Sequence, residues 1–125
     1  SGTNRDFCYS SGYEYWGKME SDGNVLSSGK KETVLRSNKK KIKRDATYDM
    51  IVHYEVIQAK EDSAAVFRVR NAQDEIIAEQ EMPSDATEIR IRDVSVTQSM
   101  EWIRYRINAQ KGSKIRIKSI ETVAQ

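Results

Sequence analysis

Along most of the chain, apolar residues alternate with polar ones at the two-residue period of a β-strand. In residues 100–109, for example, Ile103, Tyr105 and Ile107 alternate with Trp102 and with arginines. No stretch shows apolar residues at the three- and four-residue spacing of an amphipathic helix. The pattern therefore predicts a chain built of strands.

Turn-forming Gly, Asn, Asp and Ser residues separate about eight or nine short strands. The predicted strands include residues 13–20, 33–36, 47–59, 64–71, 75–82, 87–96, 100–109 and 114–123. Strands that are apolar on one side need a second sheet to cover that side. We therefore predict an all-β fold, an antiparallel β-sandwich or jelly roll, with a closed barrel of similar strand number as the alternative.

Two of these segments carry a further signal. Residues 47–59 are apolar on both alternating sides, which predicts a strand in the centre of a sheet or under strong cover. In residues 114–123 the alternation shifts phase between Ile117 and Ile120. Such a shift predicts a β-bulge.

The length of 125 residues fits one domain. Residues 13–125 are predicted to form a single β-sandwich. Residues 1–12 lack periodicity and are expected to form an N-terminal arm, in which Ser1-Gly2-Thr3 reads as a remnant of an expression vector. No signal peptide is visible, and we expect one module of a longer protein. The compartment stays open, with the cell surface or the extracellular space, such as a bacterial surface, preferred.

The composition excludes several kinds of functional site. The chain has one cysteine, Cys8, and one histidine, His53. These numbers exclude a disulfide framework and a cysteine-rich zinc site, and they disfavour histidine-based catalysis. The sequence holds neither a glycine-rich phosphate loop nor a nucleophile elbow, so we expect no enzyme activity, no cofactor and no metal. No run approaches the roughly 18 apolar residues of a membrane span.

The cations are ordered along the chain, although the net charge is only +2. Cations alternate with apolar residues at 67–70, 89–92, 103–106 and 115–118. Strand geometry places the cations of each segment on the side opposite its apolar residues. The candidate ligand-binding residues among them are Arg68, Arg70, Arg104 and Arg106. If their strands are neighbours, these guanidinium groups form a grid that suits an anionic glycan or a nucleic acid.

The alternative is that these arginines are ordinary solvated positions, neutralised across the strands by glutamates. A second basic feature is the run Lys-Lys-Lys-Ile-Lys-Arg at residues 39–44, which we interpret as a solvated loop. The small net charge disfavours nucleic acid as a partner.

Aromatic residues gather near the N-terminus. Tyr13, Tyr15 and Trp16 are candidates for a sugar-binding platform, because aromatic rings can hold the apolar faces of sugars. The alternative is that some of them belong to the core, but Trp16 has the opposite parity to the tyrosines, so the three cannot all face one core. His53 is a candidate hydrogen-bonding group for a ligand hydroxyl, with a plain surface histidine as the alternative. Trp102 is interpreted as structural.

The second half of the chain has a recurring rhythm of apolar positions. It runs Y-D-M-I-V-H-Y-E-V from Tyr48, A-V-F-R-V-R-N from Ala65, M-E-W-I-R-Y-R-I from Met100 and G-S-K-I-R-I-K-S-I-E from Gly112. Over residues 45–123 this rhythm resembles the galactose-binding-like β-sandwich superfamily, and within it the carbohydrate-binding modules attached to glycan-active enzymes. The resemblance implies a jelly roll and non-catalytic glycan binding. The acidic residues usual in the family's last strand are replaced here by Ile117-Lys118-Ser119-Ile120, so it implies no structural calcium site.

We therefore expect a non-catalytic carbohydrate-binding module that holds or targets a polysaccharide, neutral or anionic, for a larger parent protein. The alternative is a structural or protein-interaction β-sandwich with no glycan site. The sequence leaves open which glycan is bound, which parent protein carries the domain, and whether the four arginine-bearing strands share one face.

Overall fold

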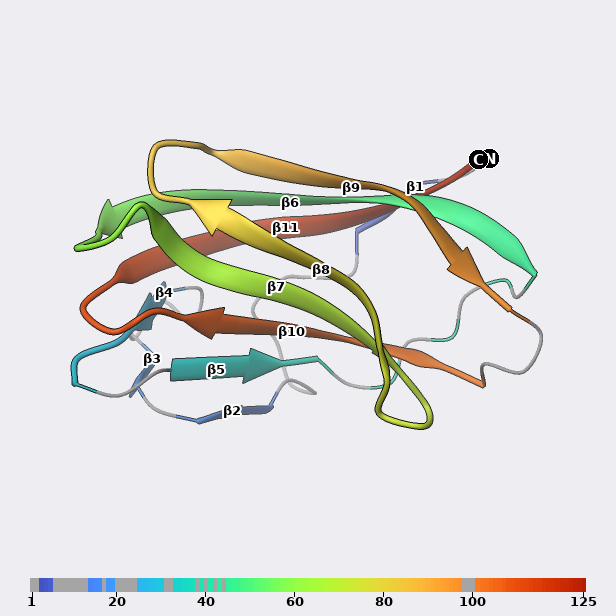
Figure 1. Cartoon of the computed structure of the whole chain (residues 1–125), viewed down its shortest axis with the longest axis horizontal. Helices are drawn as coiled ribbons and strands as arrows, with labels where there is room; N and C mark the ends of the chain where they lie inside the picture. Colours follow the sequence, from blue (N-terminus) through green and yellow to red (C-terminus); the bar gives the residue numbers. More distant parts are fainter. Residues whose placement is uncertain are drawn as a thin grey trace.

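The structure is a computed structural model that describes residues 3–5, 14–16, 18–19, 25–30, 33–37, 39, 41, 43, 45–97 and 101–125. For residues 3–5, 14–16, 18–19 and 33 the description covers the backbone. Within these residues, eleven β-strands form two antiparallel sheets that pack face to face (Figure 1). This part of the chain contains no helix long and apolar enough to cross a membrane.

The first sheet, called sheet A, is built around two long strands. Its members are β1 (Thr3–Arg5), β3 (Lys18–Met19), β4 (Val25–Ser27), β6 (Ala46–Gln58), β9 (Glu88–Val96) and β11 (Lys114–Ala124). The strand order is β3-β4-β11-β6-β9, and β1 pairs with the C-terminal half of β11. The two long strands, β6 and β11, therefore each have a neighbouring strand on both sides.

The second sheet, called sheet B, covers the inner face of sheet A. Its members are β2 (Glu14–Trp16), β5 (Thr33–Arg36), β7 (Ser63–Asn71), β8 (Ile76–Pro83) and β10 (Ile103–Ala109). The strand order is β2-β5-β10-β7-β8, with β10 between β5 and β7. Figure 1 shows β7, β8 and β10 running side by side across the sandwich.

The core lies between the sheets and is made by alternate residues of each strand. Met50 on β6, Phe67 on β7 and Tyr105 on β10 are almost completely buried. Two tyrosine hydroxyls join the layers, because the hydroxyls of Tyr105 and Thr122 lie 2.5 Å apart and Tyr54 donates to the Pro83 carbonyl at 2.7 Å. Burial, followed by the negative charge of Asp85, raises the pKa of Tyr54 to about 12, so this hydroxyl remains a donor.

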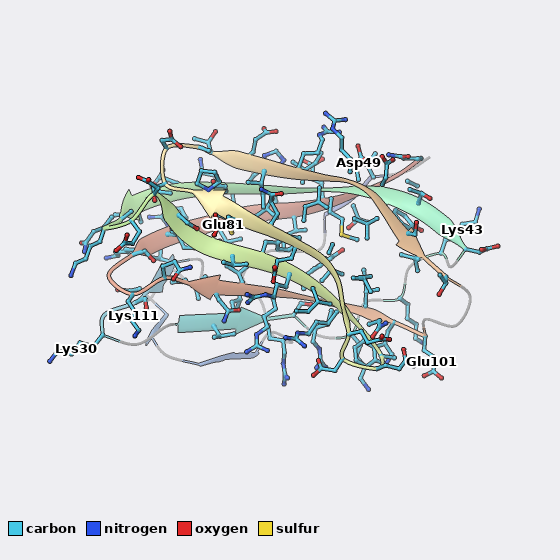
Figure 2. All side chains as sticks on the ribbon, viewed as in Figure 1. Lys30, Lys43, Asp49, Glu81, Glu101 and Lys111 are labelled. Atoms are coloured by element: carbon cyan, nitrogen blue, oxygen red, sulfur yellow. The ribbon has the colours of Figure 1, made fainter. Side chains whose placement is uncertain are left out.

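An irregularity between β6 and β9 is held by Asp49, which Figure 2 labels beside these strands. The register shifts between Tyr48 and Met50, and opposite the shift Asp93 has a φ of 59°. The Asp49 carboxylate accepts a hydrogen bond from the Asp93 amide at 3.2 Å and pairs with Arg90 at 3.1 Å. The hydrogen bond from the Asp93 amide is the main cause of the lowered pKa of Asp49. Burial acts in the opposite direction and has a smaller effect.

The predicted all-β sandwich is confirmed, and in the described residues the sheets are open instead of closing into a barrel. The central position of residues 47–59 is confirmed by β6, and the predicted bulge by the register shift between Ile117 and Ser119. The single strand predicted at 13–20 is wrong, since β2 belongs to sheet B and β3 to sheet A. The predicted N-terminal arm contains β1 among its described residues. Strands of two or three residues are too short to show an alternation, which is why the predicted strand number was too low.

Candidate functional site: an arginine face on sheet B

The outer face of sheet B carries arginines because β7 and β10 alternate strictly. On β7, Phe67 and Val69 are fully buried, and on β10 Tyr105 and Ile107 are 1% exposed. The residues between them must point to the other side of the sheet, away from the core. Those residues are Arg68, Arg70, Arg104 and Arg106, and each is partly exposed.

The pairing register brings these arginines together. Arg104 lies directly opposite Arg70, and Arg106 lies directly opposite Arg68. On its other side, Arg106 lies opposite Arg36 of β5. The sequence leaves open whether the arginine-bearing strands are neighbours. In the structure β7 and β10 are adjacent, whereas β9 and β11 carry their cations on sheet A. We call the five residues Arg36, Arg68, Arg70, Arg104 and Arg106 the arginine face.

Carboxylates neutralise one part of the arginine face. The Arg68 Nε atom lies 2.5 Å from a Glu79 carboxylate oxygen, and the Arg70 guanidinium lies 3.3 Å from Asp74. Within the described residues, Arg104 and Arg106 form no ion pair with a carboxylate. The alternative of cross-strand neutralisation therefore applies on the β8 side of the sheet, and the carboxylates that the structure describes do not extend it to β10.

Arg106 is surrounded by like charges. Burial, followed by the positive charges of Arg70, Arg36 and Arg68, lowers the pKa of Arg106, and the negative charge of Asp74 only partly opposes this. The Nε atoms of Arg70, Arg104 and Arg106 are buried and have no hydrogen-bond partner among the described residues. A bound anion would offset this repulsion, since it would supply Arg104 and Arg106 with the counter-charge that the described carboxylates do not provide.

Trp102 lies at the end of the arginine face and contacts two cations. The Arg104 guanidinium and the Lys39 ammonium each lie 5.1 Å from the centre of its ring, within the range of a cation–π interaction. Lys39 begins the basic run, whose described members Lys41 and Lys43 are exposed as well. Figure 2 shows Lys43 and Glu101 at this end of the sandwich. The positive charge therefore continues from β10 past Trp102 to the basic run.

His53 does not lie on the arginine face. It belongs to β6, on the outer side of sheet A, and is 31% exposed at its side chain. Its Nε2 atom lies 2.7 Å from a carboxylate oxygen of Glu121, and its Nδ1 atom lies 3.8 Å from Glu88. Both ring nitrogens thus face carboxylates, and the structure separates His53 from the four candidate arginines by the thickness of the sandwich.

The candidate aromatic platform lies largely outside the described residues. Tyr13 is outside them, and for Tyr15 and Trp16 only the backbone in β2 is described. The register places Tyr15 opposite Leu35 and Trp16 opposite Val34. A sugar-binding role for these three residues stays a prediction.

Arg36 was missed as a candidate from the sequence. Its strand, β5, is only four residues long. The only sequence sign that Arg36 points outward is the apolar residue before it, Leu35, which is 2% exposed in the structure. Arg36 belongs to the arginine face only because β5 pairs with β10. Strand order is set by distant pairings, which local patterns do not encode.

Two open cavities lie away from the arginine face. One, of about 530 Å³, is lined by Asp62, Glu81 and Asp85 together with Ser63, Pro83 and Ser84. The other, of about 470 Å³, is lined by residues that include Lys30, Lys60 and Lys111. Figure 2 shows Lys30 and Lys111 at the opposite end of the molecule from Lys43. In the part of the chain that the structure describes, no group of three or more His, Cys, Asp or Glu side chains is arranged to hold a metal ion.

No protein-family model matches this chain, and no curated protein sequence is significantly similar to it. Solved structures do share its fold, and most of those at the highest match probability are carbohydrate-binding modules, among them modules of families 4, 6, 29 and 61. The C-terminal family 6 module of LamC, a marine laminarinase from Zobellia galactanivorans, aligns over 98% of this chain and 99% of its own, with a TM-score of 0.57 and 13% identity.

Two further structures align over most of this chain. A family 4 carbohydrate-binding module aligns over 93% of this chain and 73% of its own, with a TM-score of 0.61 and 10% identity. The enzymatically active part of tailspike protein 4 from bacteriophage CBA120 aligns over 90% of this chain, with a TM-score of 0.62 and 10% identity. This chain spans only 18% of the tailspike chain. The chain therefore has the β-sandwich fold of carbohydrate-binding modules.

Proposed function

We propose that this domain is a non-catalytic carbohydrate-binding module that holds a polysaccharide for a larger parent protein. The observation that carries the proposal is the arginine face, which presents cations and the ring of Trp102 on one side of a fold shared with carbohydrate-binding modules. The domain supplies binding, and any catalysis belongs to another part of the parent protein.

Arginine is suited to sugars in two ways. Its guanidinium carries several N–H donors in a fixed plane, which can bond to hydroxyl and carboxylate oxygens, and the same plane can lie against an apolar sugar face. Arg68 and Arg70 are 26% and 22% exposed at their side chains, so they are accessible while their stems stay packed on the sheet. A partly ordered donor array of this kind lowers the entropic cost of binding.

The proposal is tested by affinity gel electrophoresis of the full chain through a panel of neutral and acidic polysaccharides. We expect at least one polysaccharide to retard the wild type, and the double substitution Arg104→Ala, Arg106→Ala to abolish the retardation. The matched control is Arg92→Ala with Lys118→Ala, which removes two exposed cations from sheet A and leaves sheet B unchanged.

If no polysaccharide in the panel retards the wild type, the proposal is wrong. The domain would then be a structural or protein-interaction β-sandwich without a glycan site. If the control loses retardation as much as the sheet B variant, the site does not lie on the arginine face.

A further inference from the structure

We infer that the ligand of the arginine face is an acidic polysaccharide that carries an anionic group, carboxylate or sulfate, on successive sugars. This inference rests on the proposed function and adds the substrate class. A neutral glycan would leave the charges of the face as they are, whereas an acidic chain would supply the counter-charges that Arg104 and Arg106 lack among the described residues.

The first argument is the arrangement of charge. Arg106 has arginines directly opposite it on both neighbouring strands, Arg68 on β7 and Arg36 on β5. Like charges directly opposite one another destabilise a sheet. An anion placed over Arg106 also lies close to Arg36 and to Arg68, although Glu79 already offsets part of the charge of Arg68. The gain from one anionic group is therefore larger here than at an isolated arginine.

The second argument is the spacing of the cations. Arg36, Arg106 and Arg68 form a row across three adjacent strands, and neighbouring strands are about 4.8 Å apart. An extended polysaccharide advances by a similar distance with each sugar. A chain that crosses the strands and has one anionic group per sugar would therefore meet a new arginine with each residue. Arg104 and Arg70 form a second row beside the first.

The third argument distinguishes a glycan from a nucleic acid. Single-stranded nucleic acids need open aromatic rings for base stacking, together with a strong basic excess. The net charge of this chain is +2, and the Trp102 ring is already in contact with Lys39 and Arg104. These observations favour a polysaccharide.

The test compares chains that differ in charge. The probes are polygalacturonate and its methyl-esterified form, dextran sulfate and dextran, and an oligothymidylate, each measured by titration calorimetry with the full chain. We expect polygalacturonate or dextran sulfate to bind at least about tenfold more tightly than its neutral counterpart, with an affinity that falls as salt rises. The acidic probe that binds more tightly shows whether the preferred anionic group is a carboxylate, as in polygalacturonate, or a sulfate, as in dextran sulfate.

Substitution then locates the site. Arg106→Gln and Arg104→Gln should each weaken binding of the acidic probe by about tenfold, because each removes a charge-assisted contact. Arg92→Gln on sheet A should change it by less than about twofold, since exposed cations away from the site contribute little. Thermal unfolding of each variant verifies that it is folded.

The outcomes separate the two claims. If an esterified or uncharged probe binds as tightly as the acidic one, and the arginine variants bind it normally, the inference is overturned while the proposed function stands. If the oligothymidylate binds more tightly than every polysaccharide, the inference is also overturned. If no polysaccharide binds under any salt condition, the proposed function itself is wrong.

Discussion

Arg106 lies in the middle of a row of arginines, a position in which its charge lowers the stability of the free domain. Its neighbours across both strands are cations, and its buried Nε atom has no hydrogen-bond partner among the described residues. Both features raise the free energy of the folded state, since like charges repel and a desolvated N–H loses its bond to water. A residue chosen for stability alone would be uncharged here.

The substitution Arg106→Met tests this cost. Methionine keeps an unbranched apolar stem of similar length and removes the charge and the unpaired N–H. We expect the free energy of unfolding to rise by about 1 kcal/mol, which corresponds to a melting temperature about 4 °C higher. Urea denaturation and calorimetry of the unliganded protein provide the measurement.

The matched comparison for this variant is Arg68→Met. Arg68 pairs with Glu79, so the same change there removes an attraction along with the repulsion and should leave stability nearly unchanged. A lower melting temperature for Arg106→Met than for the wild type would contradict the repulsion that we describe.

Asp49 makes stability depend on acid. Its pKa is lowered in the folded state, chiefly by the Asp93 amide, so ionised Asp49 stabilises the fold above the ordinary aspartate pKa of 3.8. This contribution is lost as the pH falls through the lowered pKa. We expect Asp49→Asn to be less stable than the wild type at neutral pH, with a difference that shrinks below pH 3.8. Denaturation midpoints of both proteins across the acid range measure it, and a constant difference would disagree with this account.

Among the elements, β6 and β10 link the two sheets through their buried tyrosines, Tyr54 and Tyr105. The Tyr105–Thr122 contact joins sheet B to sheet A, and the Tyr54–Pro83 bond joins sheet A to sheet B. The Tyr105–Thr122 contact is buried, so water cannot replace it if it is lost, whereas the Tyr54–Pro83 bond is only partly buried. The tyrosines therefore specify how the layers align as well as filling space.

The substitution Tyr105→Phe should lower the free energy of unfolding by about 1–2 kcal/mol, because the buried hydroxyl of Thr122 loses this partner. Tyr48→Phe is the control, since that hydroxyl bonds to the exposed segment at Lys43, and it should cost about 0.5 kcal/mol or less. Equilibrium urea denaturation compares the two. Equal losses in the free energy of unfolding would show that the Tyr105–Thr122 contact stabilises the fold no more than the Tyr48 hydrogen bond does.

The longer strands were predictable from the sequence because seven or more alternating residues leave a clear pattern, as in β7 and β10. The same alternation correctly placed Arg68, Arg70, Arg104 and Arg106 on the side away from the core. It could not say that β7 and β10 are neighbours while β9 and β11 lie in the other sheet, because that depends on pairings between distant segments. For the same reason the sequence could not show that His53, on β6, lies on the opposite side of the sandwich from the arginines.

At the scale of the whole molecule, a net charge of +2 conceals an uneven distribution. On the outer side of sheet A, several cations pair with carboxylates, as in the Arg90–Asp49 and Arg116–Glu55 pairs. On sheet B, Arg104 and Arg106 have no such match among the described residues. The net charge therefore does not report the local concentration of cations on sheet B.

The uneven distribution of cations should make the melting temperature depend on the salt concentration. Raising sodium chloride from about 0.05 M to about 0.5 M shortens the screening length and weakens repulsion between the arginines. We expect the melting temperature of the wild type to rise more than that of Arg106→Met, because the variant has less repulsion to screen. Differential scanning calorimetry at the two concentrations gives the comparison, and identical salt responses would contradict it.

The first and last described strands, β1 and β11, pair with each other in sheet A, in the layer opposite the arginine face. A tag fused to either end of the chain would therefore hold the domain on a sensor surface without covering sheet B. Coupling through lysine amines would instead attach some molecules through Lys39, which contacts Trp102, and would cover the arginine face in that fraction. The choice of immobilisation therefore sets how much of the arginine face stays accessible in a surface-based binding assay.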